Sequence, residues 1–355
     1  METLKRYPLR KNELLQAWDS ADELILQHSG TIPLSGKRIL IINDHFGALS
    51  RGLKDFDISV YTDSYISYQS ILLNNPRQDF LLNNLNQLTG IYDYVLIQLP
   101  KNMSYFEDIL CHLTHHLAAT SKIICGSMVK HLAPASFDLL NKYIGQTTTS
   151  LAVKKSRLIF AAFEKEKVKS PYPLEVKFAL LDQELIQQSN LFSREKLDIG
   201  TRFLLGNLPV GDYKTILDLG CGNGIVGIMA KKINPQATII FSDESQMAIL
   251  SASANYKRIF SNNAEVYWTN CYENRPSNSL DLVICNPPFH QGHSIGDFIA
   301  WQMFNDAKNS LRSGGFIRVI GNSHLKYQVS LKKIFGNSQI IASNAKFMII
   351  DSIKN

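Results

Sequence analysis

Short apolar runs alternate with amphipathic segments along the chain, and this alternation predicts a layered α/β fold. From Lys11 to about Gln27, apolar residues that include Leu14 and Trp18 recur every three or four positions. This spacing predicts a helix that Gly30 ends. Runs rich in Ile, Leu and Val predict buried strands in the first half, at residues 37–42, 58–62 and 94–98.

The second half of the sequence follows the same plan. Its expected elements are strands at 214–217, 238–242, 265–269 and 280–285, a helix at 225–233, and a terminal antiparallel hairpin of 339–343 and 346–351. In both halves one strand leads into a turn, the next runs into an aspartate (Asp63 or Asp243), and a third ends beside proline. The shared order predicts a degenerate internal duplication, although any two α/β domains show some of this likeness. The join is expected within residues 164–173, which gives domains 1–168 and 169–355.

Composition narrows the class of protein. With 355 residues, 45% hydrophobic and 19% charged, the chain is long enough for two ordinary globular domains. The five scattered cysteines form no Cys-x-x-Cys pair, and His290 and His293 lack a third ligand, so no disulfide framework and no metal site are expected. No apolar stretch is long enough to span a membrane and the start lacks a signal-peptide core, so we expect a soluble, cytoplasmic protein. The net charge of +6 permits an anionic partner without proving one.

A glycine-rich turn follows the expected strand at 214–217. Gly220, Gly222 and Gly224 allow a tight turn and let a flat ligand approach the main chain. Asp243 ends the next strand, where its carboxylate can accept both hydroxyl protons of an adenosine ribose. The pattern indicates a nucleotide-type cofactor, the alternative being a structural strand–helix turn.

An acid beside the glycines discriminates between cofactors. Asp218 would repel a pyrophosphate but attract a cationic, amino-bearing ligand, which favours S-adenosylmethionine over a nicotinamide cofactor. Asn270, at the end of 265–269, is expected either to hydrogen-bond an adenine edge or to cap the following turn.

The turn Asn286-Pro287-Pro288-Phe289 follows the strand at 280–285, at the edge of the sheet where ligands of such folds bind. The two prolines remove donors and fix φ, so their carbonyls are expected to face outward without partners. Together with the Asn286 side chain they form acceptors for the two protons of a planar amino group, and Phe289 offers a ring for stacking. A simple strand-ending turn is the alternative.

The chemistry that fits this turn is methyl transfer to an exocyclic amine by in-line displacement. Hydrogen bonds from the amine to Asn286 and Pro287 favour a pyramidal nitrogen and direct its lone pair toward the sulfonium methyl group. The proton can leave after transfer, so no general base is required and catalysis is mostly positioning.

The motifs DLGCGNG, SDES and NPPFHQG resemble those of the ribosomal RNA guanine-N2 methyltransferases, which carry a degenerate amino-terminal copy of the methyltransferase domain ahead of the active one. Longer stretches are similar to the members that act on large-subunit (23S) RNA: LQAWDSADELIL, ILIINDHFGALS, TDSYIS, TTTSLAVKKSRLI, LFSREKLDIG, KKIFGN and NAKFMII. The Asn-Pro-Pro motif alone would equally suit enzymes that methylate adenine N6 or glutamine N5.

The resemblance implies two tandem class I, Rossmann-like domains, the second with a seven-stranded, mostly parallel sheet that ends in an antiparallel hairpin. It implies methyl transfer from S-adenosylmethionine to the N2 amino group of one guanine in 23S ribosomal RNA, by a protein for which a monomer is favoured. A target inside a duplex must first be unstacked, so protein-free RNA is the expected substrate. The alternatives are a guanine of 16S RNA, DNA adenine, protein glutamine, or an RNA-binding protein that has lost catalysis.

The resemblance also assigns residues by position. The expected roles are the methionine side of the cofactor for Asp218, Gly220, Gly222 and Gly224, the ribose for Asp243, and the guanine for Asn286, Pro287 and Phe289. The segment containing Phe192 resembles one that closes over the cofactor, the alternative being a connecting loop with a buried Phe.

The amino-terminal copy departs from this pattern. It has Asp44, His45 and Phe46 before a single Gly47, and Gln98-Leu99-Pro100 in place of Asn-Pro-Pro, so it is expected to bind no cofactor although it keeps Asp63. We expect it to engage RNA, with Lys154, Lys155 and Arg157 neutralising phosphates. A solvated strand edge protected by lysines is the alternative.

Overall fold

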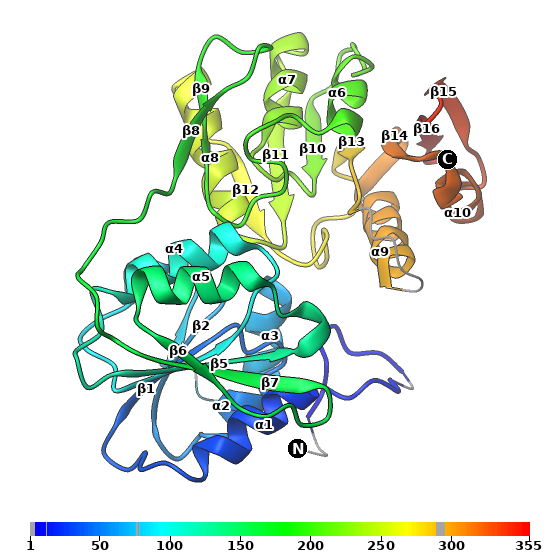
Figure 1. Cartoon of the computed structure of the whole chain (residues 1–355). Coiled ribbons are helices and arrows are strands. Elements are labelled where there is room, and N and C mark those ends of the chain that lie inside the picture. Colours follow the sequence, from blue (N-terminus) through cyan, green and yellow to red (C-terminus); the bar gives the residue numbers. More distant parts are fainter. Residues whose placement is uncertain (1–3, 12, 76, 78, 289–294) are drawn as a thin grey trace. The chain divides into compact units, whose positions relative to one another are not determined.

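The chain forms two compact units, which meet in sequence between Tyr172 and Pro173 (Figure 1). The structure is a computed structural model and describes residues 4–11, 13–75, 77, 79–288 and 295–355. Each unit contains its own seven-stranded sheet, and the strands of the two sheets are arranged in the same order. The duplication expected from the sequence is therefore present in the topology.

The first unit has the strand order β3-β2-β1-β4-β5-β7-β6. Its strands are β1 (Arg38–Ile42), β2 (Asp57–Tyr61), β3 (Leu81–Leu82), β4 (Tyr94–Gln98), β5 (Lys122–Met128), β6 (Thr147–Thr149) and β7 (Ser156–Ala162). Its helices are α1 (Ser20–Ser29), α2 (Ala48–Gly52), α3 (Tyr65–Asn74), α4 (Met103–Leu113) and α5 (Pro134–Tyr143), with short 3-10 turns η1 (Leu85–Gln87) and η2 (Val129–His131).

The second unit repeats this order as β12-β11-β10-β13-β14-β16-β15. Its strands are β10 (Thr215–Leu219), β11 (Thr238–Asp243), β12 (Glu265–Trp268), β13 (Leu280–Cys285), β14 (Leu311–Asn322), β15 (Gln339–Ser343) and β16 (Phe347–Ile353), preceded by a two-stranded sheet of β8 (Leu174–Lys177) and β9 (Glu184–Gln187). Its helices are α6 (Ile199–Leu205), α7 (Ile225–Ile233), α8 (Gln246–Phe260), α9 (Ile295–Ser310) and α10 (Tyr327–Phe335), with a 3-10 turn η3 (Ser323–Leu325).

In both sheets the neighbouring strands are parallel, except for the pairs that involve β7 in the first unit and β16 in the second. In the second unit β16 runs antiparallel to both β14 and β15, which confirms the expected terminal hairpin. Its loop is closed by Asn344, whose side chain accepts hydrogen bonds from the N–H groups of Lys346 and Phe347 at 2.9 and 2.8 Å. The antiparallel strand removes the need for a further crossover helix at that edge.

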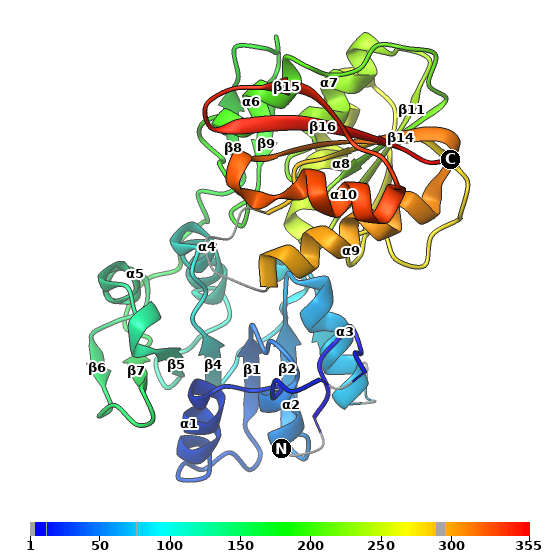
Figure 2. The ribbon, with the colours of Figure 1, turned by 90° about the vertical axis from the view of Figure 1, so that its right-hand side faces the viewer.

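Apolar residues cover both faces of the second sheet. One core joins α6, α7 and α8 to β10 and β11, with Leu204, Ile228 and Phe241 among its members. The other joins α9 and α10 to β13 and β14 and includes Phe304 and Leu331. Figure 2 shows α9 and α10 together on the same side of this sheet. The sheet is therefore buried on both faces, which leaves the ends of its strands as the place for chemistry.

The first helix is shorter than its apolar pattern predicts. It begins at Ser20 rather than near Lys11, because Asp19 accepts from the N–H groups of Ala21 and Asp22 while the Asp22 carboxylate accepts from the Asp19 N–H. Leu14, expected on the buried face of this helix, is 94% exposed and precedes it. The helix ends beside Gly30, as predicted.

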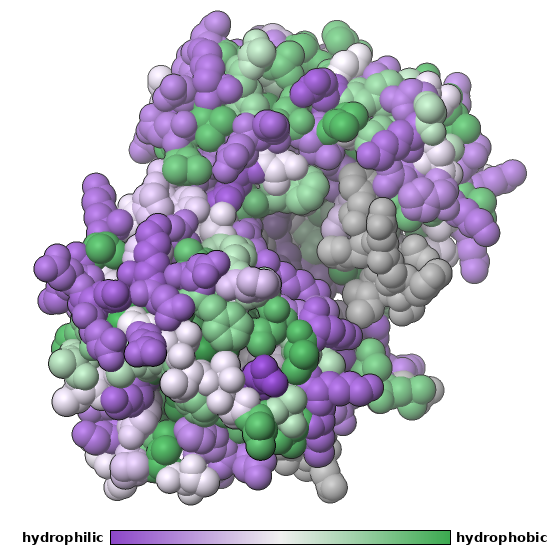
Figure 3. Space-filling view, viewed as in Figure 1, coloured by the Kyte–Doolittle hydropathy of each residue, from purple (hydrophilic) through white to green (hydrophobic). Residues whose placement is uncertain are grey.

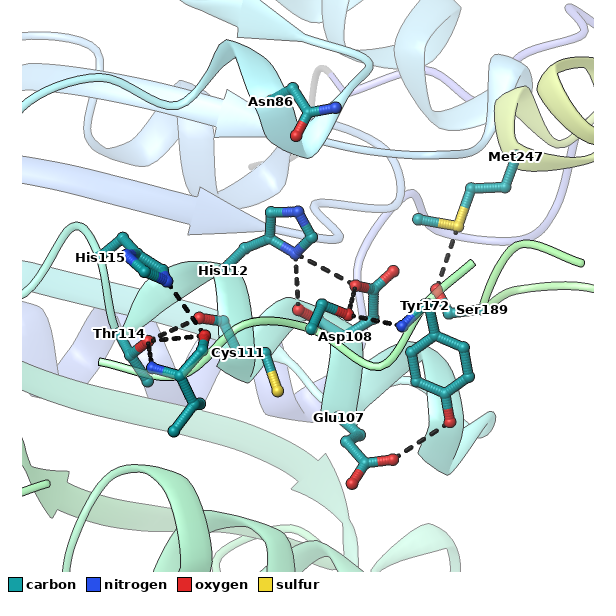
Figure 4. A network of polar contacts seen from close by, with 12 residues as sticks. Asn86, Glu107, Asp108, Cys111, His112, Thr114, His115, Tyr172, Ser189 and Met247 are labelled. Atoms are coloured by element: carbon teal, nitrogen blue, oxygen red, sulfur yellow. Dashed lines mark hydrogen bonds and ion pairs between the residues drawn. The ribbon is translucent and has the colours of Figure 1, made fainter. Parts of the chain in front are cut away.

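Residues 168–172, which lead from the first unit to the second, form hydrogen bonds with the first unit. The Thr114 hydroxyl oxygen accepts from the Val168 N–H at 3.0 Å, Ser170 donates to Asp108 at 2.6 Å, and Tyr172 donates to Glu107 at 3.1 Å. Figure 4 shows this network, with Glu107 and Asp108 on α4, Thr114 just after the helix, and Tyr172 on the connecting segment. The expected division after residue 168 therefore falls inside a segment that belongs to the first unit, and the two units separate after Tyr172.

Hydrophilic side chains are spread over the visible face of each unit rather than gathered in one block (Figure 3). Among the described residues, the helices are all too short or too polar to cross a lipid bilayer.

Candidate active site

The glycine-rich turn joins β10 to α7 and depends on backbone conformations that favour glycine. Gly220, Gly222 and Gly224 have φ values of +76°, +53° and +82°. A Cβ on Gly224 would lie 2.9 Å from the Ala252 side chain of α8, so this glycine permits close helix packing. A Cβ on Gly222 would meet no atom within 4 Å, so this glycine borders open space at the edge of the sheet.

Asp218 lies beneath this turn. Its carboxylate is buried and accepts a hydrogen bond of 2.8 Å from the Gly227 N–H in the first turn of α7. Burial raises the pKa of this carboxyl to about 8, with the hydrogen bond from Gly227 acting in the opposite direction. An amino group brought close would lower the pKa again, because a positive charge stabilises the ionised carboxylate.

Asp243 ends β11 on the other side of the turn. One carboxylate oxygen accepts from the Gly222 N–H at 2.9 Å and the other from the Ser245 N–H at 3.0 Å. Burial raises the pKa of Asp243, while these hydrogen bonds oppose the shift. The carboxylate is thus fixed against the glycine turn at the end of β11, and its contact with a ribose stays a prediction.

Asn286 follows β13 directly, and Pro287 and Pro288 continue the chain away from the sheet. The Asn286 Nδ2 donates to the Thr201 hydroxyl oxygen on α6 at 3.0 Å. Its Oδ1 is buried and has no hydrogen-bond partner among the residues that the structure describes. An unpaired buried acceptor is energetically unfavourable, so this oxygen is available for a donor on a ligand. Phe289, the stacking residue expected from the sequence, lies outside the described residues, as do His290 and His293.

Asn270 and Phe192, both predicted from the sequence to contact the cofactor, differ in their burial. Asn270 is buried, and its amide donates to Glu273 at 3.1 Å within the turn that follows β12. These contacts match the turn-capping alternative, and a contact with adenine stays a prediction. Phe192 lies in a connecting loop but is 75% exposed, so the expectation of a buried Phe there is wrong. Closure of this segment over the cofactor stays a prediction.

The strand registers align the two units residue by residue. Ile42 pairs with Tyr61 and Ile97 just as Leu219 pairs with Ser242 and Cys285, which makes the residues after these strand ends equivalent. Gln98 therefore corresponds to Asn286, and Asn43, with φ of +61°, corresponds to Gly220.

The same register corrects one expectation from the sequence. The residue equivalent to Asp243 is Thr62, not Asp63, because Thr62 directly follows Tyr61 as Asp243 directly follows Ser242, and Tyr61 and Ser242 are the equivalent paired positions. Thr62 and Asp243 also accept equivalent hydrogen bonds. The Thr62 hydroxyl accepts from the Ser64 N–H at 3.2 Å, and the Asp243 carboxylate accepts from the Ser245 N–H. The first unit therefore has a threonine in place of Asp243 and lacks two of the three glycines.

Side chains of the first unit occupy the corresponding strand ends. The Tyr105 hydroxyl donates to Asn43 Oδ1 at 3.1 Å, and the Asn43 amide donates to the Gln98 carbonyl at 3.2 Å. Gln98 in turn donates through its side chain to Asp22 on α1. All four residues are buried, so their side chains fill this edge of the first unit. That this unit binds no cofactor stays a prediction.

The three residues predicted to engage RNA lie in and after a two-residue turn at the start of β7. Lys154 and Lys155 adopt φ values of +47° and +63° between the bridged residues Val153 and Ser156. Lys154 forms an ion pair with Glu23 at 2.7 Å, and no ion pair to Lys155 is found in the described part of the chain. Lys155 is exposed and Arg157 is partly exposed.

Sequence reasoning missed Thr201. Its partner Asn286 is 85 residues away, so no local pattern links the two. The one available signal was Asp198, which caps α6 by accepting from the Thr201 N–H at 3.0 Å and so marks the start of a helix at the site. Among the described residues, no group of three or more His, Cys, Asp or Glu side chains is arranged to hold a metal ion.

Comparison with known proteins agrees with this architecture. Residues 1–165 match the family model described as the RLMG N-terminal domain, and residues 182–351 match the methyltransferase small domain. A protein of Psychromonas ingrahamii named ribosomal RNA large subunit methyltransferase G is 42% identical, with 99% of this chain and 96% of that protein covered. The chain belongs to the ribosomal RNA large subunit methyltransferase G family.

Other relatives give the same picture for this methyltransferase. A Stutzerimonas stutzeri protein of the same name is 41% identical over 99% of this chain and 96% of its own length. Among solved structures, a T. thermophilus 16S rRNA methyltransferase of the N2 type, determined with AdoMet and guanosine, superposes with a TM-score of 0.80. It is 21% identical, with 95% of this chain and 92% of that chain covered, and it shows that the two-unit fold is shared.

Proposed function

We propose that this methyltransferase transfers a methyl group from S-adenosylmethionine to the N2 amino group of one guanine in 23S ribosomal RNA. The family to which the chain belongs supports a ribosomal RNA substrate of the large subunit. The choice of an amino group as acceptor of the methyl rests on one observation, the buried and unpaired Oδ1 of Asn286 at the carboxyl end of β13.

The oxygen of Asn286 suits the exocyclic amine of guanine. That amine carries two protons and no accessible lone pair, because the lone pair is delocalised into the ring. A hydrogen bond to Asn286 Oδ1, with a second to the Pro287 carbonyl, favours a pyramidal nitrogen and localises the lone pair. The nitrogen then forms a bond to carbon as the carbon–sulfur bond breaks, and one N–H proton leaves afterwards to solvent.

The residues around the glycine turn suit S-adenosylmethionine, which supplies an electrophilic methyl group on a sulfonium centre. Gly222 leaves open space over the turn, and Asp243 is held beside it by two backbone N–H groups. We assign the ribose hydroxyls to Asp243 and the methionine side to the turn of Gly220, Gly222 and Gly224. Asp218 supports this turn from beneath and favours a cofactor with an amino group.

We assign RNA engagement to a basic edge of the first unit, made of Lys101, Lys130, His131, Lys155 and Arg157. The Val129 N–H donates to the Lys155 carbonyl at 2.8 Å, which brings η2 alongside the turn at the start of β7. Burial and then the charges of Lys101 and Lys130 lower the pKa of His131, so these cations lie close to one another. A cluster of this kind at the carboxyl ends of β4 and β5 suits a phosphate backbone.

Variants of the basic edge test this assignment. We expect Lys130→Glu combined with Lys155→Glu to weaken RNA binding and to lower the dependence of log Kd on log salt by roughly one to two. Lys54→Glu, at the opposite edge of the same sheet, serves as the control. Equal effects of the two changes would refute the assignment, and the affinity for S-adenosylmethionine should stay constant throughout.

We further propose that protein-free RNA is preferred, since a paired guanine must leave its duplex to reach Asn286. Parallel assays on naked 23S RNA and on assembled large subunits test this preference. Equal or greater activity on subunits would contradict it.

The central experiment uses radiolabelled S-adenosylmethionine and protein-free 23S RNA from cells that lack the enzyme, followed by nucleoside analysis. We expect labelled N2-methylguanosine from the wild-type protein. Asn286→Ala should lower kcat at least 100-fold, because it removes the acceptor, while cofactor affinity stays unchanged. Label in 16S RNA, DNA adenine or protein glutamine instead would replace the substrate assignment.

A further inference from the structure

Thr201 lies on α6, and its hydroxyl oxygen accepts a hydrogen bond from the Asn286 side chain. We propose that Thr201 is a positioning residue, whose hydroxyl oxygen accepts from the Asn286 Nδ2 and so turns Oδ1 toward the amino group to be methylated. This inference rests on the proposed function, since it concerns the same acceptor oxygen.

The chemistry of a primary amide explains why a partner is needed. An asparagine side chain has a donor end and an acceptor end, and a half-turn about its last bond exchanges them. For Oδ1 to face a donor, Nδ2 must face the opposite way and find an acceptor there. At this site that acceptor is the Thr201 hydroxyl oxygen, at 3.0 Å, and without it a rotated amide would present N–H groups to the amine.

The first unit supplies an independent version of the same arrangement. Asp22 and Thr201 occupy equivalent positions, the third residue of a helix capped by Asp19 in one case and Asp198 in the other. Gln98, the register equivalent of Asn286, donates its side-chain N–H to Asp22. In both copies, therefore, the side-chain amide nitrogen of the residue after β4 or β13 donates to the third residue of the helix that precedes the seven-stranded sheet, α1 or α6.

The partner differs between the copies in a way that fits catalysis in only one of them. The Gln98–Asp22 pair sits in a filled network with Asn43 and Tyr105, whereas Asn286 Oδ1 is left without a partner in the described residues. Burial and the neighbouring Asp44 raise the pKa of Asp22 to about 7, so a carboxyl group at this place titrates near neutral pH. The Thr201 hydroxyl group accepts from the amide nitrogen and carries no charge that changes with pH.

Three variants test the role of Thr201. Thr201→Val removes the hydroxyl but keeps the branched shape, Thr201→Ser restores a hydroxyl, and Thr238→Val is a control at an exposed threonine of β11. On protein-free 23S RNA we expect Thr201→Val to lower kcat by about 10- to 100-fold, since small displacements of reacting groups have effects of that size. The kcat of Thr201→Ser should stay within about threefold of that of wild type, and the kcat of Thr238→Val should equal that of wild type.

A double variant separates positioning from a structural role. If Thr201 acts through Asn286, Thr201→Val should cause no further loss of single-turnover rate in an Asn286→Ala background. The Kd for S-adenosylmethionine and the Tm should be those of wild type in Thr201→Val.

The outcomes have distinct meanings. An active wild type with an equally active Thr201→Val overturns this inference alone. An equal loss in the Asn286→Ala background, or a matching loss of cofactor affinity, also overturns it, because a structural role would explain both. A wild type that methylates no amino group in any nucleic acid or protein overturns the proposed function, and this inference with it.

Discussion

Adding one methyl group at Gly222 should remove cofactor binding while leaving a folded protein. The residue has φ of +53°, a region where an L residue with a Cβ is less stable by about 1–2 kcal/mol. Nothing lies within 4 Å of the added Cβ, so no clash adds to this strain. In a unit of this size, about 1 kcal/mol lowers Tm by roughly 2–4 °C. The methyl group itself would project into the space that we assign to S-adenosylmethionine.

Gly336→Ala is the matched control for Gly222→Ala. Gly336 has φ of +85°, also has nothing within 4 Å of its Cβ position, and follows α10 away from the glycine turn. Both variants should lose about the same Tm by calorimetry. Titration calorimetry should show that Gly222→Ala binds S-adenosylmethionine at least about tenfold more weakly, which is about 1.4 kcal/mol, with Gly336→Ala unchanged. Equal cofactor affinity in the two variants would refute the placement of the ligand over Gly222.

Two further predictions concern charged groups. Arg318 and Asp351 form a largely buried ion pair with contacts of 2.8 and 2.6 Å, so Asp351→Ala should lower the free energy of unfolding of the second unit by up to about 3–5 kcal/mol in urea titrations. The exposed Glu175, paired with Arg258, gives a control in the same unit, and a comparable loss in Glu175→Gln would contradict the role of burial. In the first unit, burial and the charge of Asp44 raise the pKa of Asp22 to about 7 from 3.8. The folded unit therefore holds a proton that the unfolded chain has released between about pH 4 and 7, and its free energy of unfolding should fall as pH rises through this window. Asp22→Asn should flatten that decline in hydrogen exchange of the β1 and β4 peptides, and an unchanged slope would show that Asp22 does not titrate there.

The parts of the fold that the sequence predicted well are those governed by local signals. Apolar runs located β4 and β13 at their observed bounds, and the glycines located the turn into α7. The first helix was predicted too long, because the apolar spacing continues through Leu14 while the Asp19–Asp22 capping pair starts the helix later. Here a specific pair of hydrogen bonds outweighs periodicity.

The parts of the site that escaped prediction depend on contacts between distant residues. Thr62 was passed over in favour of Asp63, because residue type suggested an acid and only the strand register shows which side chain is equivalent to Asp243. Thr201 carries no motif of its own, and its contact with Asn286, which follows β13, is what links it to the site. The roles of the individual site residues remain predictions, and the variants above test them.

The paired amides at Gln98 and Asn286 also bear on how a duplicated enzyme diverges. After duplication, the copy that loses its ligand no longer needs an open acceptor, and its strand ends are free to gain folding stability. In the first unit a chain of hydrogen bonds from Tyr105 through Asn43 and Gln98 to Asp22 closes this edge. Selection would then act on the first edge through the stability of its core and on the second through the chemistry at Asn286. Substitutions at matching positions of the two halves should accordingly be tolerated by different rules: small residues near Gly222, but residues that keep the hydrogen bonds near Asn43.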